Sequence, residues 1–268
     1  MKKIMIYSML CGALLLLLAG CGKDGSTEGG GQKTLRVVTD AAYSPMEFMD
    51  KDKVSGFDID FIRAAAKEAG YKVKVEHVGW DPLFVEVKVK RADIGISAIS
   101  IKPDREKSYT FSVPYFISTN KILVPEGSDI KSGKDLKGKR VAVQAGTTGQ
   151  FVTEDILGKN NKNISKFENT TLAIMELTKK GADAVVADNA VIEEYAKKNP
   201  DKKLNVVEDP SFAGEYYGVI FEKGNKKLKK KFDEAINTLF ENGTYEKIYQ
   251  KWLGSTPDIE TLKEQQKK

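Results

Sequence analysis

The sequence predicts an α/β fold built from two similar lobes. Segments that favour strands, because they are β-branched or alternate apolar and polar residues, are followed by amphipathic segments at helical spacing along most of the 268 residues. This order is typical of sheets covered by helices. In addition, RADIGI at 91–96 resembles GADAVV at 181–186 in chemical outline, since each places an Ala-Asp turn before a buried strand. A generic preference at αβ turns is the alternative source of so short a repeat, but two lobes are the simpler account.

The N-terminal segment differs from the rest of the chain. Two lysines and an apolar run precede LAGC at 18–21, which resembles a bacterial lipoprotein processing site. We therefore expect residues 1–20 to be a signal peptide cleaved before Cys21, whose sulfur then carries lipid; an uncleaved anchor is the alternative. Cys11 is then discarded, so no disulfide is expected. The Gly-rich residues 21–33, which begin with the lipidated cysteine, are expected to form a flexible tether.

The first lobe is expected to begin near Thr34. LRVVTD (35–40) favours a strand, GFDIDFIRAAAKEAG (56–70) has helical spacing and a glycine stop, and YKVKVEHV (71–78) alternates as a strand does. LFVEVKVK (83–90) also alternates, but the α/β order requires a crossover there, so we expect a helix. KRADIGISAIS (90–100) is expected to be a more continuous, buried strand.

The second lobe and the tail continue the same order. LKGKRVAVQAGTTGQ (136–150) is expected to be a strand entering a loop, FVTEDIL (151–157) a helix, and residues 167–199 a helix, a strand and a helix. EYYGVIFEKGN (215–225) is expected to be a strand, followed by two amphipathic helices separated at Asn242-Gly243. The lysines at 226–231 avoid the apolar stripe and are expected to be a solvated face, with polyanion or membrane binding as the alternative. The stripe of the first of these helices consists of Leu228, Phe232, Ala235, Ile236, Leu239 and Phe240.

Composition excludes several functions. The 43 basic and 38 acidic residues are interleaved, and the net charge is +5, which does not indicate nucleic-acid binding. The chain shows no nucleophile–base pairing and no metal-ligand spacing, and its single histidine, His77, lies on an alternating strand where a structural role is expected. We therefore expect no cofactor, no metal and no catalysis.

Candidate binding residues lie where strands of an open α/β sheet end. An arginine fork matches a carboxylate through two parallel hydrogen bonds, and hydroxyls or amides at a helix start complete such a site, so Arg105 with Ser100 and Thr148 predicts an anion site. The alternative is a surface salt bridge from Arg105 to Asp104 or Glu106. On the opposite lobe, Asp188 matches an ammonium, so one zwitterion would bridge and close both lobes.

A second group of candidates is suited to the ligand side chain. Tyr43 and Trp80 offer aromatic faces for an alkyl chain or a cation. Asp40, close to Tyr43 in the sequence, favours a second positive charge on the ligand.

From about Thr34 to Gly254 the chain resembles bacterial extracellular solute-binding proteins for polar amino acids, which supply ABC importers. The resemblance rests on TDAAYSPMEF (39–48), SGFDIDF (55–61), SAISIKPDREKSYTFSVPYF (97–116), LKGKRVAVQAGTTG (136–149) and NGTYEKIYQKWLG (242–254). Together these motifs are specific, although any one of them could occur by accident. The segment LFVEVKVK (83–90) departs from the helical sequence pattern that is usual in the family.

The resemblance implies a role for each candidate residue. Arg105 would hold the α-carboxylate with help from Ser100, Ala98 and Thr148, and Asp188 would bind the α-ammonium. Because Ala98 lacks a hydroxyl that some relatives have, only its backbone can contribute. Tyr43 and Trp80 would flank the ligand side chain, and the polar end of that side chain would meet Asp40.

The resemblance also implies two α/β lobes joined by two crossing strands, near Lys121–Val124 and Glu215–Val219. We therefore expect lobe 1 at 34–124, lobe 2 at 125–214, and a return segment to lobe 1 at 215–268. Closure about this hinge on binding is expected.

The pocket charges favour a basic ligand. Asp40, with Glu47 or Asp58 as further candidate anions and no second arginine, disfavours glutamate. Glu47 and Asp58 have an alternative interpretation as solvated or helix-start charges. We expect arginine first, then lysine, ornithine or histidine. Glutamine remains an alternative, because an aspartate also accepts hydrogen bonds from an amide.

The expected function is capture of a basic amino acid by a monomeric, lipid-anchored protein outside the cell membrane, and delivery to the permease subunits of an ABC importer. A cyclohexadienyl dehydratase-like enzyme on the same fold and a sensing module are the alternatives from other classes.

Overall fold

The computed structural model describes residues 32–267, and from Lys33 onward they form one compact unit. The expected signal peptide, the expected lipidation site Cys21 and nearly all of the expected tether lie outside the described residues. Within residues 32–267, no helix combines the length and the apolar character that crossing a membrane requires.

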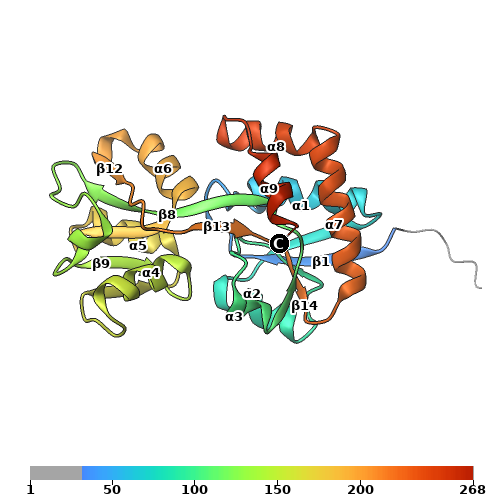
Figure 1. The fold of residues 1–268 in the computed structure, drawn as a ribbon, viewed down its shortest axis with the longest axis horizontal. Helices are drawn as coiled ribbons and strands as arrows, with labels where there is room; N and C mark the ends of the chain where they lie inside the picture. Colours follow the sequence, from blue (N-terminus) through green and yellow to red (C-terminus); the bar gives the residue numbers. More distant parts are fainter. Residues whose placement is uncertain (1–31, 268) are drawn as a thin grey trace, which may run out of the picture. The chain divides into compact units, whose positions relative to one another are not determined.

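The first sheet contains β1 (Thr34–Thr39), β5 (Lys72–His77), β6 (Ile94–Gly95), β7 (Tyr109–Phe111) and β14 (Ile220–Glu222) (Figure 1). Its strand order is β5-β1-β6-β14-β7; β1 pairs in parallel with β5 and β6, whereas β14 pairs antiparallel with β6 and β7. Successive side chains of β1 point to opposite faces, and both faces are buried. The neighbours Val37 and Val38 accordingly belong to two different hydrophobic clusters.

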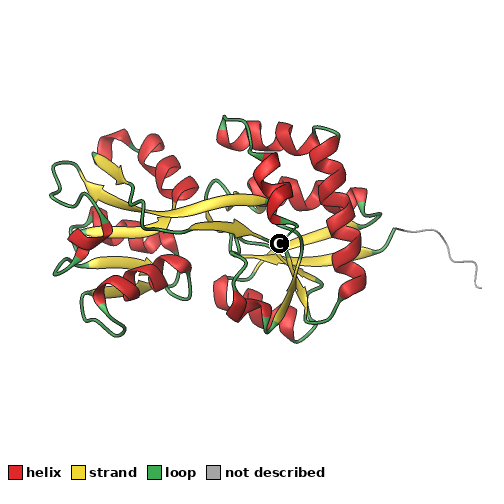
Figure 2. Cartoon of the chain, viewed as in Figure 1, coloured by secondary structure: helices red, strands yellow, loops and turns green. Residues whose placement is uncertain are grey.

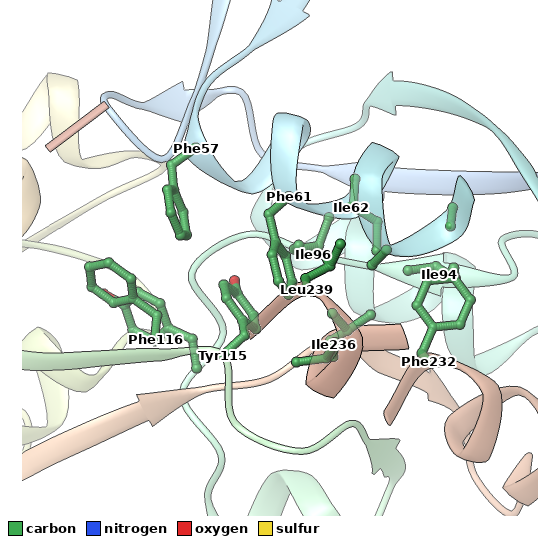
Figure 3. Close-up of a cluster of buried hydrophobic side chains, with 14 of the residues drawn as sticks. Phe57, Phe61, Ile62, Ile94, Ile96, Tyr115, Phe116, Phe232, Ile236 and Leu239 are labelled. Carbon is green, nitrogen blue, oxygen red and sulfur yellow. The ribbon is translucent and has the colours of Figure 1, made fainter. Parts of the chain in front are cut away.

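The largest core lies against α1 (Phe57–Glu68), α7 (Lys226–Glu241) and α8 (Thr244–Leu253) (Figure 3). The ring of Phe61 stacks on that of Tyr115 with centroids 4.4 Å apart, and Phe57 meets Tyr245 edge-on. Every residue of the predicted α7 stripe is buried, as predicted. The last helix, α9 (Ile259–Gln265), which follows α8, was not predicted. This core makes the first lobe a firm support for the loops at the ends of its strands.

The second sheet contains β8 (Phe116–Pro125), β9 (Val141–Gln144), β10 (Ile164–Phe167), β11 (Ala184–Asp188) and β12 (Leu204–Val207). Its order is β10-β9-β11-β8-β12, with β9 parallel to β10 and β11, and β8 antiparallel to β11 and β12. Two clusters cover its two faces: one includes residues of α5 (Thr170–Thr178) and α6 (Asn189–Lys198), and the other residues of α4 (Thr148–Leu157). The two-lobed α/β fold class is confirmed.

Two antiparallel strands connect the lobes, β8 and β13 (Gly214–Tyr217) (Figure 2). Phe116 to Thr119 pair with β13, and Phe116 packs in the core of the first lobe. Leu123 already belongs to a core of the second lobe. The first crossing therefore lies before the predicted Lys121–Val124, which is part of the second sheet. Because β8 is one continuous strand, its sequence does not mark where it leaves a lobe.

The ambiguous segment 83–90 is mostly helix, as predicted, within α2 (Trp80–Lys88). Leu83 and Val87, four residues apart, are buried on one face, whereas Val85 and Val89 are exposed. These two exposed valines produce the strand-like alternation in the sequence. Tertiary packing on β1 and β14 decides in favour of the helix.

Other elements differ from the prediction. The continuous strand expected at 90–100 is limited to β6, because the chain turns at Ala98, which has a φ of +47°. The strand expected at 215–225 is two strands, β13 and β14, that pair with different partners. The small sheet of β2 (Ala42–Tyr43), β3 (Glu47–Asp50) and β4 (Lys53–Ser55) and the strands β7, β10 and β12 were not predicted.

Candidate functional site

The loops between the two sheets border a small cavity of about 20 Å³, which is roughly the space that one water molecule needs. All the site residues predicted from the sequence border it. They are Asp40, Tyr43, Glu47, Trp80, Ala98, Ser100, Arg105, Thr148 and Asp188. Ser97, Gln144 and Thr147 complete the lining. These additional residues also lie at strand ends, so the rule that selected the others could have found them.

Arg105 lies in the short helix α3 (Pro103–Glu106), and only 9% of it is exposed. Its Nη1 donates to the carbonyl of Ser100 (3.0 Å) and its Nη2 to that of Gly146 (3.2 Å), so it contacts both lobes. Among residues 32–267, no carboxylate lies within 4.0 Å of its nitrogens, and the alternative salt bridge to Asp104 or Glu106 is not formed. Burial lowers the pKa of Arg105. A buried guanidinium with N–H donors left over is suited to an anion.

Trp80 and Gly146 form the wall beside this arginine. The guanidinium carbon of Arg105 lies 5.3 Å from the centroid of the Trp80 ring, a distance at which a cation is attracted to an aromatic face. Gly146 has a φ of +72°, and a Cβ at this position would lie 3.1 Å from Nε1 of Trp80. Glycine therefore permits both the turn and the close approach of the two lobes here.

The start of α4 faces the same cavity. Thr147 caps the helix by accepting a hydrogen bond from the backbone N–H of Gln150, and Thr148, the first helical residue, is 6% exposed. The N–H groups of a first helical turn attract negative charge. The start of α4 therefore adds to the attraction of Arg105 for an anion.

Asp188 ends β11 and precedes α6. Its Oδ2 accepts a hydrogen bond from the hydroxyl of Tyr217 (2.5 Å), and its backbone N–H donates to the hydroxyl of Tyr43 (3.3 Å). Burial and, to a smaller extent, the charge of Glu215 raise the pKa of Asp188 to about 7. A neighbouring cation would favour the ionised form of this carboxyl group.

Asp40 is 5% exposed and accepts a hydrogen bond from Nε2 of Gln144 (3.0 Å), a residue of the other lobe. Its Oδ1 lies 4.0 Å from Nδ1 of His77, which itself accepts from the backbone N–H of Ala41 (2.9 Å). His77 thus has the structural role predicted for it. Burial raises the pKa of Asp40, so a cation at this carboxylate would offset a cost of burial.

Glu47 and Asp58 are fully buried, so their interpretation as solvated charges is wrong; Asp58 does lie in the first turn of α1. Oε1 of Glu47 accepts from the hydroxyl of Ser97 (2.7 Å). Burial and the charge of Asp58 raise the pKa of Glu47 well above its usual range, and burial also raises the pKa of Asp58. The two buried carboxyl groups therefore hold a proton more tightly than exposed ones do.

Asp58 also changes the expectation for Ala98. Oδ2 of Asp58 accepts a hydrogen bond from the backbone N–H of Ala98 at 2.7 Å. This N–H is the only backbone donor that Ala98 has, and it is already engaged. Ala98 borders the cavity, but in this arrangement its amide points to Asp58.

Comparison with known proteins identifies the family of the chain. Residues 35–255 match the model of the bacterial extracellular solute-binding proteins, family 3. A probable histidine-binding protein of Neisseria gonorrhoeae is 40% identical over 257 residues, which cover 94% of this chain and 96% of that protein. The chain therefore belongs to this family of extracellular solute-binding proteins. Separately, the described residues contain no cluster of three or more potential metal ligands.

Two solved structures are similar along most of the chain. The arginine-, lysine-, histidine-binding protein ArtJ from Geobacillus stearothermophilus is 50% identical with a TM-score of 0.84, covering 86% of this chain and all of ArtJ. An ancestral arginine-binding protein, solved with glutamine bound, is 39% identical with a TM-score of 0.78, covering 84% of this chain and all of that protein. These similarities confirm the family predicted from the sequence and its two-lobed binding-protein fold.

Proposed function

We propose that the protein binds a basic L-amino acid and delivers it to the permease of an ABC importer. The observation that carries the proposal is that the buried guanidinium of Arg105 shares one cavity with the carboxylates of Asp40 and Asp188. Among residues 32–267, this guanidinium has no carboxylate partner within 4.0 Å. A zwitterion with a second positive charge complements this set, because each buried charge then has a partner of opposite sign.

Each part of the ligand has a proposed partner. The α-carboxylate pairs with Arg105 and with the first turn of α4 at Thr148, and the α-ammonium pairs with Asp188. The aliphatic part of the side chain lies between Tyr43 and Trp80, and its cationic end meets Asp40. Arginine is the first candidate, followed by lysine, histidine and ornithine; ArtJ is described as binding the first three.

Closure of the lobes is part of the proposal. Asp40 already contacts Gln144, and Arg105 contacts Gly146, so two hydrogen bonds cross between the lobes beside the cavity. A ligand that binds residues of both lobes favours the closed arrangement by the difference in its affinity for the two arrangements. We further propose that residues 215–268 return to the first lobe, whereas the boundary expected at residue 124 moves to before Lys121, because Leu123 already belongs to a core of the second lobe.

Glutamine is the second candidate ligand, because an arginine-binding relative has been solved with glutamine bound. Asp40 accepts hydrogen bonds from an amide, but its charge then has no cationic partner. A dehydratase-like enzyme is the alternative from another class, and nothing in the chemistry of the described cavity residues favours it over binding.

Beyond the described residues, we propose that lipid on Cys21 anchors the protein to the outer face of the cell membrane, where the tether at 21–33 allows the lobes to reach the permease. Lipid on the mature protein, detected by mass spectrometry of the purified chain, tests this part separately.

The binding proposal is tested by calorimetric titration of the protein after unfolding and refolding to remove carried-over ligand. Arginine, lysine, histidine, glutamine and glutamate are compared. Tight binding of arginine or lysine with none of glutamate supports the proposal. A preference for glutamine would contradict the assignment of a cationic ligand. If none of the five amino acids binds, amino-acid binding is contradicted, and dehydration of cyclohexadienyl substrates should then be tested.

A further inference from the structure

A carboxylate outside the cavity lining contacts both lobes where the strands cross. Glu215 lies on β13, opposite Ser118 of β8. Its Oε2 accepts a hydrogen bond from the hydroxyl of Ser100 at 2.5 Å, and its Oε1 accepts from Nδ2 of Asn120 at 2.6 Å. Ser100 belongs to the loop that borders the cavity in the first lobe, whereas Asn120 pairs with Asp188 in the second sheet. One side chain thus connects a cavity residue to the crossing strands.

This contact conflicts with the role expected for Ser100. A serine hydroxyl has a single proton, and an ionised carboxylate can only accept hydrogen bonds. While the proton of Ser100 is donated to Glu215, it cannot also be donated to the carboxylate of a bound amino acid. The carbonyl of Ser100 is engaged as well, since it accepts from Arg105 (3.0 Å). Ser100 therefore positions Arg105 through its carbonyl, and its hydroxyl contributes no donor to the anion in this arrangement.

We infer that Glu215 is a positioning residue that competes with the ligand carboxylate for the proton of Ser100. The inference rests on the proposed function, because it needs a ligand with a carboxylate at Arg105. Glu215 lowers the share of Ser100 in the binding energy, and it couples the anion site to the crossing strands through Asn120. Removing the acceptor on Glu215 releases the hydroxyl for the ligand.

A double-mutant cycle tests this competition. Ser100→Ala is made in the full-length wild-type protein and in Glu215→Met, which keeps the side-chain length but lacks an acceptor; Glu215→Ala serves as a second acceptor-free variant. The dissociation constant is measured by titration with whichever of arginine, lysine and histidine binds the wild-type protein most tightly. Effects of Glu215 on charge or on Asn120 occur in both backgrounds and cancel from the cycle.

The expected result is a background-dependent cost of Ser100→Ala. In the wild-type protein it weakens binding less than about threefold, and in Glu215→Met about tenfold or more, as expected for a lost hydrogen bond to a charged acceptor. A ratio of the two factors below threefold, or an inverted ratio, would overturn the inference. Glu222→Met is the matched control and should give a ratio near one, because Glu222 lies on β14 of the return segment, outside the cavity lining, and pairs with Lys90. If the wild-type protein binds none of the three amino acids, the proposed function fails instead.

Discussion

Replacing Asp40 by asparagine should convert a preference for arginine into one for glutamine. Asparagine keeps the size of the side chain and an oxygen that can accept from Gln144, so the contact between the lobes is retained. Only the negative charge is lost. A cationic side chain therefore loses its ionic partner, whereas an uncharged amide side chain still finds a hydrogen-bonding group.

The expected size of the effect follows from the burial of Asp40, which is 5% exposed. Opposite charges about 4 Å apart attract by about 4 kcal/mol at an effective dielectric constant of about 20, and removing one member of such a buried pair costs roughly 2–5 kcal/mol. With a factor of ten for each 1.4 kcal/mol, the affinity for arginine should fall about 30- to 3,000-fold. The affinity for glutamine should change by less than about fivefold.

Calorimetric titration of both ligands against the wild-type protein and Asp40→Asn provides the assay. Asp52→Asn, an exposed aspartate in a neighbouring turn, is the matched control and should leave both affinities unchanged. Melting curves establish that both variants are folded. An equal loss for arginine and glutamine would refute the reasoning, because it would show that Asp40 acts on the common part of the ligand or on closure.

Further predictions concern the anion site, the ammonium site and the fold. Arg105→Lys should weaken binding of every amino acid by at least about tenfold in the same titrations, since a point charge cannot replace the two-pronged contact; unchanged affinity would remove Arg105 from the site. Because burial raises the pKa of Asp188 to about 7, the protonated carboxyl must lose its proton to pair with an ammonium. Affinity for arginine should therefore rise from about pH 5.5 to about pH 8, with proton release on binding near pH 6.5 in buffers of different ionisation heat; a flat profile would contradict this. Gly56→Ala should cost about 2 kcal/mol and so lower the melting temperature by roughly 4–8 °C, at about 2–4 °C per kcal/mol for a chain of this size, because Gly56 has a φ of +134° and a Cβ there would lie 2.2 Å from the carbonyl oxygen of Met46. Gly127→Ala, also at positive φ but in open space, should cost less, and equal costs would show that backbone strain alone is responsible.

The sequence was informative wherever local chemistry decides the structure. Helical spacing predicted α7 with its buried stripe, because burial of an apolar face at period 3.6 is a local property. The rule that ligands lie at the carboxyl ends of strands selected Arg105, Asp188 and Asp40, which the structure brings to one cavity. The family motifs added Ala98 and the crossing strands to this set.

Other features depend on partners that are distant in the sequence. Nothing local in β8 marks the residue at which it passes from one lobe to the other, since its partners lie about 60 to 100 residues away. The amide of Ala98 is engaged by Asp58, and the hydroxyl of Ser100 by Glu215, at sequence separations of 40 and 115 residues.

The sequence alone thus determined the α/β class, the family and most of the residues around the cavity, because these follow from residue type and short-range pattern. Only the tertiary structure decided which donors of that cavity are still available to a ligand. The physical reason is that each N–H or O–H has one proton to donate, and the competing acceptors come from parts of the chain that only folding brings together.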